Sequence, residues 1–299
     1  MAEPSPATGW EFVEGDRIGP ERTILGHLGG GSDFDVYLVW DERRFTIVVG
    51  KLLRPHLVDD EVALRHLRRE AEALRLLAHP VLIRSFDAVY DRPHPHLLIE
   101  HLEGTTLRRV LRRGGPLPMQ QLLPLALHVA AALHYLAAEG WVHLDVKPDN
   151  IVMGIPARLI DLSVARPLEE AGRLRSALGT DAYMAPEQCD PSAFASGVGS
   201  PADVWGLGAT LHHAISGELP FPRAADDRDS PDPLVRFPQL GNEPRPLPRG
   251  TPEQLVALVG SAMHPDPAER PSAAEFALGL EPLVDALPRR MSLSRRGIA

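Results

Sequence analysis

The first hundred residues carry two hydrophobic periodicities. Short β-branched and aromatic runs at 37–40 and 45–49, separated by a polar turn, predict a β-hairpin. Residues 60–78 change period, because their apolar side chains recur mostly at steps of three or four amid many charges. That spacing predicts one amphipathic helix packed on the sheet. Two further strands are expected at about 83–90 and 96–100.

After Gly104 the pattern becomes helical. Residues 121–138 place apolar side chains on one face and end near Gly140. Prolines recur at short intervals from 220 to 252, which predicts an irregular surface connection because each proline removes a backbone donor. A small sheet-plus-helix lobe followed by a larger helical lobe is therefore expected, with further helices at 202–215, 252–263 and 273–287.

Composition excludes several classes of protein. Of the 299 residues, 44 % are hydrophobic and 24 % charged, which is ordinary for a globular domain. The formal net charge of −9 offers no reason to expect nucleic-acid binding. The single cysteine, Cys189, rules out an internal disulfide. Without a long uninterrupted apolar run or signal-peptide features, we expect a cytoplasmic protein with no membrane partner. The oligomeric state stays open.

The strongest local signal is the run His143-Leu-Asp-Val-Lys-Pro-Asp-Asn150. Phosphoryl transfer requires an aligned nucleophile and cations on the phosphates rather than covalent help from the protein. Asp145 can accept the proton of a substrate hydroxyl, Asn150 can coordinate a magnesium ion, and Lys147 can reach the transferring phosphate. One short loop would hold all three around a single point.

This run resembles the catalytic loop of eukaryotic-type serine/threonine protein kinases, and the compact chain resembles a bacterial member. The resemblance extends over roughly residues 24–285 and its motifs occur in the family's order. It is carried by the third-strand lysine Lys51, the helix glutamate Glu70, Asp161 in Leu-Ile-Asp-Leu-Ser, the segment 179–187 ending in Ala-Pro-Glu, the segment 203–208, and Arg270.

The resemblance implies an α+β, bilobal protein-kinase-like fold, with a β-rich N-lobe carrying one regulatory helix and a larger, mainly helical C-lobe. It implies ATP as phosphate donor and Mg²⁺, with Mn²⁺ as the alternative ion, held by Asn150 and Asp161. The expected organisation is an N-terminal extension at 1–22, a kinase domain at 23–287 (N-lobe about 23–100, C-lobe about 104–287) and a basic tail at 288–299. The tail is either a plain extension, or a pseudosubstrate or autophosphorylation segment.

Further site residues follow from the resemblance. Ile99 would be the gatekeeper, and backbone groups of Glu100 and Leu102 would bind the adenine edge. Lys147 and Thr180 match the pair that marks serine/threonine specificity. The catalytic set is Asp145, Lys147, Asn150, Lys51, Glu70 and Thr180; the nucleotide set is Leu28, Gly29, Gly30, Gly31, Val36, Val49, Lys51, Ile99, Glu100 and Leu102.

Three departures from the family pattern stand out. Phe34 occupies the third glycine position of the glycine-rich loop, where a side chain hinders backbone approach to phosphate. Leu144 replaces the arginine that precedes the catalytic aspartate, which predicts activity independent of phosphorylation at Ser176. Leu162 and Ser163 replace the Phe-Gly pair that follows the metal-binding aspartate.

Two other functions compete with an active protein kinase. A pseudokinase would use the fold as a nucleotide-binding or regulatory module, and the three departures favour it, whereas the complete polar set argues against it. A small-molecule phosphotransferase would share the lysine and both aspartates. Such enzymes lack the Ala-Pro-Glu segment and its arginine partner, so Glu187 and Arg270 favour protein substrates with Ser or Thr acceptors.

Overall fold

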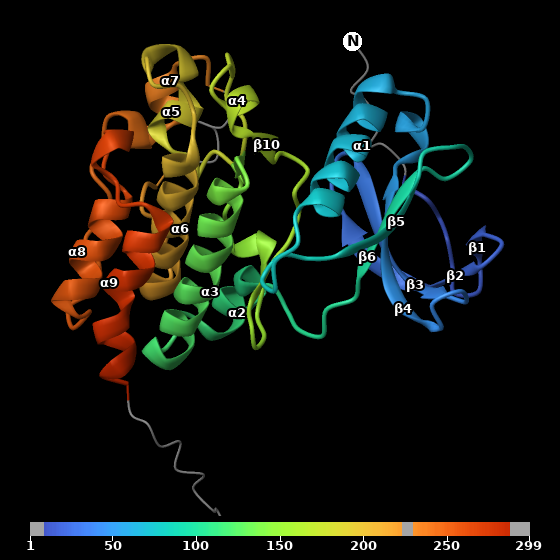
Figure 1. Ribbon diagram of the computed structural model, residues 1–299, viewed down its shortest axis with the longest axis horizontal. Helices are drawn as coiled ribbons and strands as arrows, with labels where there is room; N and C mark the ends of the chain where they lie inside the picture. The colour runs from blue at the N-terminus through green and yellow to red at the C-terminus, as the bar shows by residue number, and fades with distance from the viewer. Residues whose placement is uncertain (1–8, 223–229, 288–299) are drawn as a thin grey trace, which may run out of the picture.

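The protein folds into the two lobes that its hydrophobic pattern predicts (Figure 1). The computed structural model describes residues 9–222 and 230–287, so the basic tail expected at 288–299 lies outside the described residues. One lobe holds the sheet and helix α1, and the other holds the remaining α-helices. The expected bilobal α+β class is confirmed.

A six-stranded antiparallel sheet forms the N-lobe, with strand order β1-β2-β3-β4-β6-β5. Alternation in β3 directs Tyr37 and Val39 into one apolar cluster, because successive strand residues face opposite sides. The predicted strands are present, and two further strands, β1 and β2, precede the predicted hairpin in the chain. Its strands are β1 (Arg17–Gly19), β2 (Arg22–Gly30), β3 (Phe34–Asp41), β4 (Thr46–Leu53), β5 (Ser85–Val89) and β6 (His96–Glu100).

The segment ahead of β1 covers the face of the sheet that carries Tyr37. The Trp10 amide donates to Asp35 Oδ2 at 2.8 Å, and its indole Nε1 donates to the Leu53 carbonyl at 2.7 Å. Phe12 stacks on Trp10 and packs edge-on against Tyr37. This cover buries aromatic surface that would otherwise face water.

Helix α1 (Glu61–Leu76) covers the other face, as the period of residues 60–78 predicts. Asp60 caps its first turn by accepting hydrogen bonds from the amides of Val62 and Ala63. Its buried stripe is apolar apart from one carboxylate, Glu70, which is 3 % exposed. A buried carboxylate on an apolar face requires a partner, and the opposing strand β4 supplies it.

The C-lobe is built around α3 (Met119–Ala138), which packs against α6 (Ser200–Ser216) and α9 (Ala273–Asp285). By length and composition α3 could cross a membrane, but half of its apolar window is buried inside the protein, as in a core helix of a globular domain. The remaining elements are α2 (Leu107–Gly114), β7 (Trp141–Val142), β8 (Ile151–Val152), β9 (Arg158–Leu159), β10 (Arg166–Pro167), α4 (Leu168–Ala171), α5 (Pro186–Cys189), α7 (Pro233–Arg236) and α8 (Glu253–Ala262).

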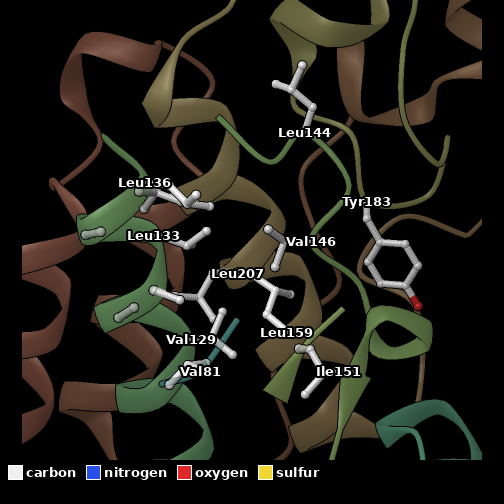
Figure 2. Close-up of a cluster of buried hydrophobic side chains, with 14 of the residues drawn as sticks. Val81, Val129, Leu133, Leu136, Leu144, Val146, Ile151, Leu159, Tyr183 and Leu207 are labelled. Carbon is white, nitrogen blue, oxygen red and sulfur yellow. The ribbon is translucent and has the colours of Figure 1, made fainter. Parts of the chain in front are cut away.

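An apolar cluster lies directly beneath the predicted catalytic loop (Figure 2). Leu144 and Val146 of that loop are each 2 % exposed and belong to the same core as residues of α3 and α6. Close packing of this kind fixes the loop backbone, because a buried side chain loses its contacts if the loop moves. The other labelled members are Val81, Val129, Leu133, Leu136, Ile151, Leu159, Tyr183 and Leu207.

Candidate active site

Lys51 joins the two lobes through two carboxylates. Its Nζ donates to both carboxylate oxygens of Glu70, at 2.9 and 2.8 Å, and to Asp161 Oδ1 at 2.9 Å. Glu70 comes from α1 and Lys51 from β4, whereas Asp161 follows β9 in the other lobe. Three residues separated widely in sequence therefore meet at one ammonium group.

The charges of this cluster shift one another's pKa values. Burial alone would lower the pKa of Lys51, but attraction by Glu70 and Asp161 outweighs it and the pKa is raised. Burial raises the pKa of Glu70, partly offset by Lys51. Burial would also raise the pKa of Asp161, yet the Lys51 ammonium holds it well below its usual range. Asp161 is thus an anion at neutral pH, and its side chain is 34 % exposed.

Helix α6 holds the backbone of the catalytic loop. Asp203 accepts hydrogen bonds from the amides of His143 and Leu144, both at 2.7 Å. Thr210 donates to the Val146 carbonyl at 3.3 Å. At Gly206 an added Cβ would lie 3.1 Å from the Val146 Cβ, so glycine permits the loop to rest on the helix. Burial raises the pKa of Asp203, against the effect of these donors.

The loop places Lys147 and Asn150 against Asp145, and Thr180 of the activation segment contacts Lys147. Lys147 Nζ donates to Asp145 Oδ2 at 2.7 Å and to Thr180 Oγ1 at 2.6 Å. The Asn150 amide nitrogen donates to Asp145 Oδ2 at 3.0 Å and to its carbonyl oxygen at 2.9 Å. Oδ1 of Asp145 is buried and has no hydrogen-bond partner among the described residues. A buried carboxylate oxygen without a donor is costly, so it is a candidate acceptor for a substrate hydroxyl.

Two residues of the site hold left-handed backbone conformations that side chains disfavour. Leu144 has φ 64° and Asp161 has φ 67°. At Leu144 the strain is held from both sides, because Asp203 accepts its amide proton and Gln188 donates to its carbonyl at 2.9 Å. At Asp161 the ion pair with Lys51 holds the side chain in place. Strained backbone of this kind persists where surrounding contacts over-determine it.

A cavity of about 530 Å³ opens beside the Lys51 cluster and is lined from both lobes. Of the residues expected to bind nucleotide, seven line it: Leu28, Val36, Val49, Lys51, Ile99, Glu100 and Leu102. Glu70, Asn150 and Asp161 also line it, whereas Gly29, Gly30 and Gly31 are not among its lining residues. Thr180 lines a second cavity of about 430 Å³ under the activation segment.

The side chain of Glu100 has a structural role at the end of β6. It is paired with Arg84 at 3.1 Å and with Arg158, and it also accepts a hydrogen bond from the Arg84 amide. These contacts attach the segment between the lobes to both of them. The side chain is thereby occupied, so any contact with an adenine ring is left to the backbone.

Phe34 packs into the site rather than projecting from the glycine-rich turn. Its side chain is 9 % exposed and its ring lies 4.6 Å from Lys51 Nζ, a cation–π geometry. Gly30 approaches the same strand closely, because an added Cβ would lie 2.6 Å from the Phe34 carbonyl oxygen. The ring thus occupies space next to the lysine expected to hold phosphate.

The other two differences from the family pattern are Leu144 and the pair Leu162 and Ser163, and both leucines pack in the core. Leu144 and Leu162 are both buried, at 2 % and 0 % exposure, so neither offers a charge to the activation segment. Ser163 donates its amide to Asp161 Oδ1 at 3.4 Å. Apolar packing after Asp161, the aspartate expected to bind the metal, is therefore retained with leucine in place of phenylalanine.

Sequence reasoning missed α2 and the residues it brings to the cavity. Thr106 and Arg109 line the cavity, together with Leu74, Ile83, Val152 and Ile160. The signal for α2 was a threonine cap: Thr106 accepts the Arg109 amide, and glycine follows at the helix end. Eight residues rich in arginine show too little hydrophobic periodicity to reveal a helix.

A small sheet lobe with a lysine–carboxylate pair, facing a helical lobe with an aspartate–lysine–asparagine loop, defines the class of protein kinase folds. The sequence profile of the family described as "Protein kinase domain" matches residues 22–278. The match covers most of the chain, and the chain belongs to the protein kinase domain family. The resemblance inferred from the motifs is confirmed.

Curated bacterial relatives agree with this assignment. The chain is 34 % identical over 263 residues to the probable serine/threonine-protein kinase PkwA of Thermomonospora curvata. It is 31 % identical over 278 residues to PknB of Mycobacterium leprae, and 31 % identical over 274 residues to PknD of Mycobacterium tuberculosis. These matches cover 87 %, 87 % and 88 % of this chain but only 34 %, 42 % and 40 % of the relatives. The chain thus spans less than half the length of these relatives.

Proposed function

We propose that this chain is a serine/threonine protein kinase that transfers the γ-phosphate of ATP to Ser or Thr hydroxyls of proteins, with Mg²⁺ as its metal and Mn²⁺ as the alternative. The observation that carries the proposal is the buried, unpartnered Oδ1 of Asp145 beside Lys147. A pseudokinase is less well supported, because every polar residue of the family's reaction is present and assembled.

The metal would be held by Asp161 and Asn150. The carboxylate of Asp161 is partly exposed. Asn150 directs its amide nitrogen toward Asp145, which leaves the Asn150 side-chain oxygen available as a metal ligand. Within residues 9–222 and 230–287, no cluster of three or more His, Cys, Asp or Glu could hold the ion alone. Phosphate oxygens of the nucleotide would therefore complete its coordination. Bound there, the ion neutralises charge on the phosphates.

The transfer itself uses the residues around Asp145. The substrate oxygen forms a bond to the γ-phosphorus, and the bond from that phosphorus to the bridging β–γ oxygen breaks, which leaves ADP. Asp145 Oδ1 accepts the hydroxyl proton, while Lys147 stabilises the transferring phosphoryl group. Lys51, held by Glu70, contacts the phosphates of ATP. Thr180 keeps Lys147 in place through its 2.6 Å hydrogen bond.

Phosphate incorporation from γ-labelled ATP tests the proposal. We expect incorporation with wild type and with Asp91→Asn, an exposed control that undergoes the same chemical change, and a fall of at least about 10³-fold with Asp145→Asn. No incorporation, with Mg²⁺–nucleotide still raising the melting temperature, would establish the pseudokinase. If the protein shows no incorporation and nucleotide does not raise the melting temperature, the result contradicts nucleotide binding itself.

Protein rather than small-molecule substrates are supported by the segment that ends in Glu187. Arg270 pairs with Glu187 at 2.6 and 2.9 Å and secures α5 next to the second cavity, where a peptide could lie. A screen of Ser/Thr peptides against small alcohols and aminoglycosides would separate the two. Turnover of only the small molecules would reject this part of the proposal.

We further propose that the catalytic loop works without activation-segment phosphorylation. Leu144 supplies no cation, and Ser176 is exposed on the segment. Ser176→Ala is expected to keep kcat within about twofold, since no charge pair forms at Leu144 to be lost. Arg173→Ala, an exposed change three residues away, is the control. A loss of tenfold or more confined to Ser176→Ala would reject the idea.

The boundaries and location of the domain also remain proposals. We place the kinase domain at 23–287, with the N-lobe ending near residue 100 and the C-lobe starting near 104. The sheet extends back to Arg17, and Leu287 follows the last helix. We assign the domain to the cytoplasm, where ATP is available. The one cysteine, Cys189, is buried and free, which is compatible with a reducing compartment.

A further inference from the structure

Helix α2 carries four arginines that the phosphoryl-transfer chemistry does not use. Leu107 and Leu111 are buried and attach the helix to the core. The remaining positions include Arg108, which is half-buried, and three exposed arginines. We call the four the α2 arginines: Arg108, Arg109, Arg112 and Arg113.

None of the α2 arginines lies in an ion pair with any described residue. Their one side-chain hydrogen bond among these residues runs from Arg108 to the Tyr183 hydroxyl at 3.5 Å. Many arginines elsewhere are paired, as Arg69 is with Glu170 at 3.0 Å. Those without an ion pair among the described residues, such as Arg43 and Arg75, do not form a cluster of four on one short helix. An acidic protein thus leaves four adjacent cations uncompensated.

Helix stability does not explain this placement. Arg112 and Arg113 lie in the last turn, where the negative end of the helix dipole favours cations. Arg108 and Arg109 lie in the first turn, where the dipole opposes them, and that turn contains no acidic residue. The spacing also sets like charges four residues apart, which destabilises an isolated helix. Two of the four α2 arginines, Arg108 and Arg109, therefore lie where the helix dipole is unfavourable to a positive charge.

The α2 arginines line a groove of about 420 Å³, together with Thr106 and Asp149. We call it the arginine groove. It shares Thr106 and Arg109 with the cavity beside the Lys51 cluster, which we propose holds the nucleotide and call the nucleotide cavity. It shares Arg108 and Asp149 with the cavity under the activation segment. Asp149 directly precedes Asn150 of the catalytic loop. The groove therefore lies beside the position expected for the acceptor hydroxyl.

The charge of the groove selects its ligand. Four guanidinium groups and one carboxylate give a formal charge of +3 (4 − 1) in a chain whose net charge is −9. Guanidinium groups bind carboxylates and phosphates with paired hydrogen bonds. A concave surface of one charge raises the local concentration of oppositely charged ligands. Acidic polypeptide fits this groove, and basic polypeptide is repelled.

We propose that the arginine groove binds acidic residues that flank the acceptor in the substrate, so that this kinase prefers acidic Ser/Thr sequences. The inference rests on the proposed kinase function and names the substrate class of that same site. Asp and Glu, or a residue already phosphorylated, present the same anionic oxygens. Asp149 disfavours an acid directly against it, so the anions lie toward Arg112 and Arg113.

A set of peptides tests the preference. Each has one acceptor Ser in the same neutral scaffold, flanked on both sides by Glu, by Gln or by Lys, and a fourth carries phosphoserine in place of Glu. We expect kcat/KM for wild type to be about tenfold higher with Glu than with Gln, and lowest with Lys, mainly through KM. Higher salt should reduce the difference, because exposed charges are screened. A higher rate with phosphoserine than with Glu would identify primed substrates.

The variant Arg112→Gln/Arg113→Gln tests the groove itself. Both side chains are exposed and outside the nucleotide cavity, unlike Arg109. In this variant, kcat/KM for the Glu peptide is expected to exceed that for the Gln peptide by only about twofold or less. Arg43→Gln, an exposed arginine in the β3–β4 turn, is the control and should keep the wild-type ratio. An unchanged ratio in the double variant, or a wild-type preference for Gln or Lys, would overturn the proposal.

A binding measurement separates this inference from the kinase proposal. The Glu peptide with Ala at the acceptor, carrying a fluorescent label, is titrated with wild type and with the double variant by anisotropy. Binding that weakens about fivefold or more in the double variant supports the groove even if no peptide is phosphorylated. Phosphorylation of all peptides at equal rates would overturn the groove and leave the kinase function standing. Equal binding by both proteins would overturn the groove as well.

Discussion

Two buried ion pairs, one in each lobe, differ in how fully they are satisfied. Arg270 uses all five N–H donors: two reach Glu187, and three reach the carbonyls of His264, Pro201 and Pro265. Both side chains of that pair are 0 % exposed. The charges cancel and no group is left to bind anything else.

The pair between Lys51 and Glu70 is mostly buried, with side chains 12 % and 3 % exposed, and it belongs to a cluster that is not neutral. One ammonium faces two carboxylates, and the second, Asp161, is 34 % exposed toward the cavity. The cluster keeps one negative charge in excess, directed at the space where a metal ion would lie. An ion pair such as Arg270–Glu187, in which every donor is already used, stabilises the fold; we call it the saturated pair. A cluster with residual charge and a partly exposed carboxylate can take part in a reaction.

The largest expected effect comes from removing that residual charge. Asp161→Asn should lower kcat by at least about 10³-fold, near 4 kcal/mol, because the metal loses its charged ligand. The melting temperature should fall only slightly, because Lys51 loses one of its two carboxylate partners but keeps its pair with Glu70. Kinase assays and thermal unfolding measure both. A large loss of stability would mean that the cluster is architectural after all.

Breaking the saturated pair should reverse this pattern. Arg270→Met leaves Glu187 buried without a partner and should lower the free energy of unfolding by about 3–5 kcal/mol. Denaturant unfolding measures the loss. The control, Arg245→Met, breaks an exposed pair with Glu218 and should cost about 1 kcal/mol or less. Equal costs for the two variants would contradict the distinction between buried and exposed pairs.

His96 extends the comparison to a buried group that must stay neutral. Arg22 donates to its Nε2 at 2.9 Å, its Nδ1 faces the His94 carbonyl at 2.5 Å, and Asp87 pairs with Arg22 nearby. Burial lowers the pKa of His96 to about 4. Between pH 6.5 and 4 the unfolded chain therefore binds more protons, so stability falls as pH falls.

The acid loss attributable to His96 should reach about 3 kcal/mol at pH 4, from 1.36 kcal/mol per pKa unit. His96→Gln cannot titrate and should flatten this part of the pH profile, as measured by denaturant unfolding at each pH. His101→Gln, an exposed change, is the control. Identical slopes for wild type and His96→Gln would show that other groups carry the acid sensitivity.

The smallest expected effect tests the contact on the open side of Lys51. Phe34→Leu removes the ring 4.6 Å from the ammonium but keeps apolar volume, so stability should change by about 1 kcal/mol. The KM for ATP should fall about two- to fivefold, because space beside the phosphates opens. Phe34→Gly should also change this KM, at a larger cost in stability. Steady-state kinetics at saturating peptide measure the change, and an unchanged KM in both variants would show that the ring does not affect nucleotide binding.

The long periodic elements were predictable because their own side chains define them. The helix expected at 60–78 is α1 at Glu61–Leu76, and that expected at 121–138 is α3 at Met119–Ala138. Strand β2 was not predicted, since its stretch Arg-Thr-Ile-Leu-Gly-His-Leu-Gly-Gly has three glycines and weak alternation. Pairing with β3 stabilises it as a strand, which is a tertiary effect.

Motif order identified the residues of the candidate site but not their contacts. Lys51 and Asp161 are 110 positions apart, and only the packing of the two lobes places them 2.9 Å from each other. The free Oδ1 of Asp145 and the position of the Phe34 ring were likewise invisible, because each depends on several neighbours. The arginine groove required α2, a helix too short for its pattern to be recognised.

By itself the sequence determined the family, the two-lobed order of sheet and helices, and the residue types needed for phosphoryl transfer. Those features are local or depend on spacing along the chain. Tertiary structure alone decided which charges are satisfied and which remain available. Whether a charged group has all its hydrogen-bond and ion-pair partners depends on every donor and acceptor close to it in space. Most of these come from distant parts of the chain. That is why Arg270 and Lys51, both buried cations beside a glutamate, differ in what they can do.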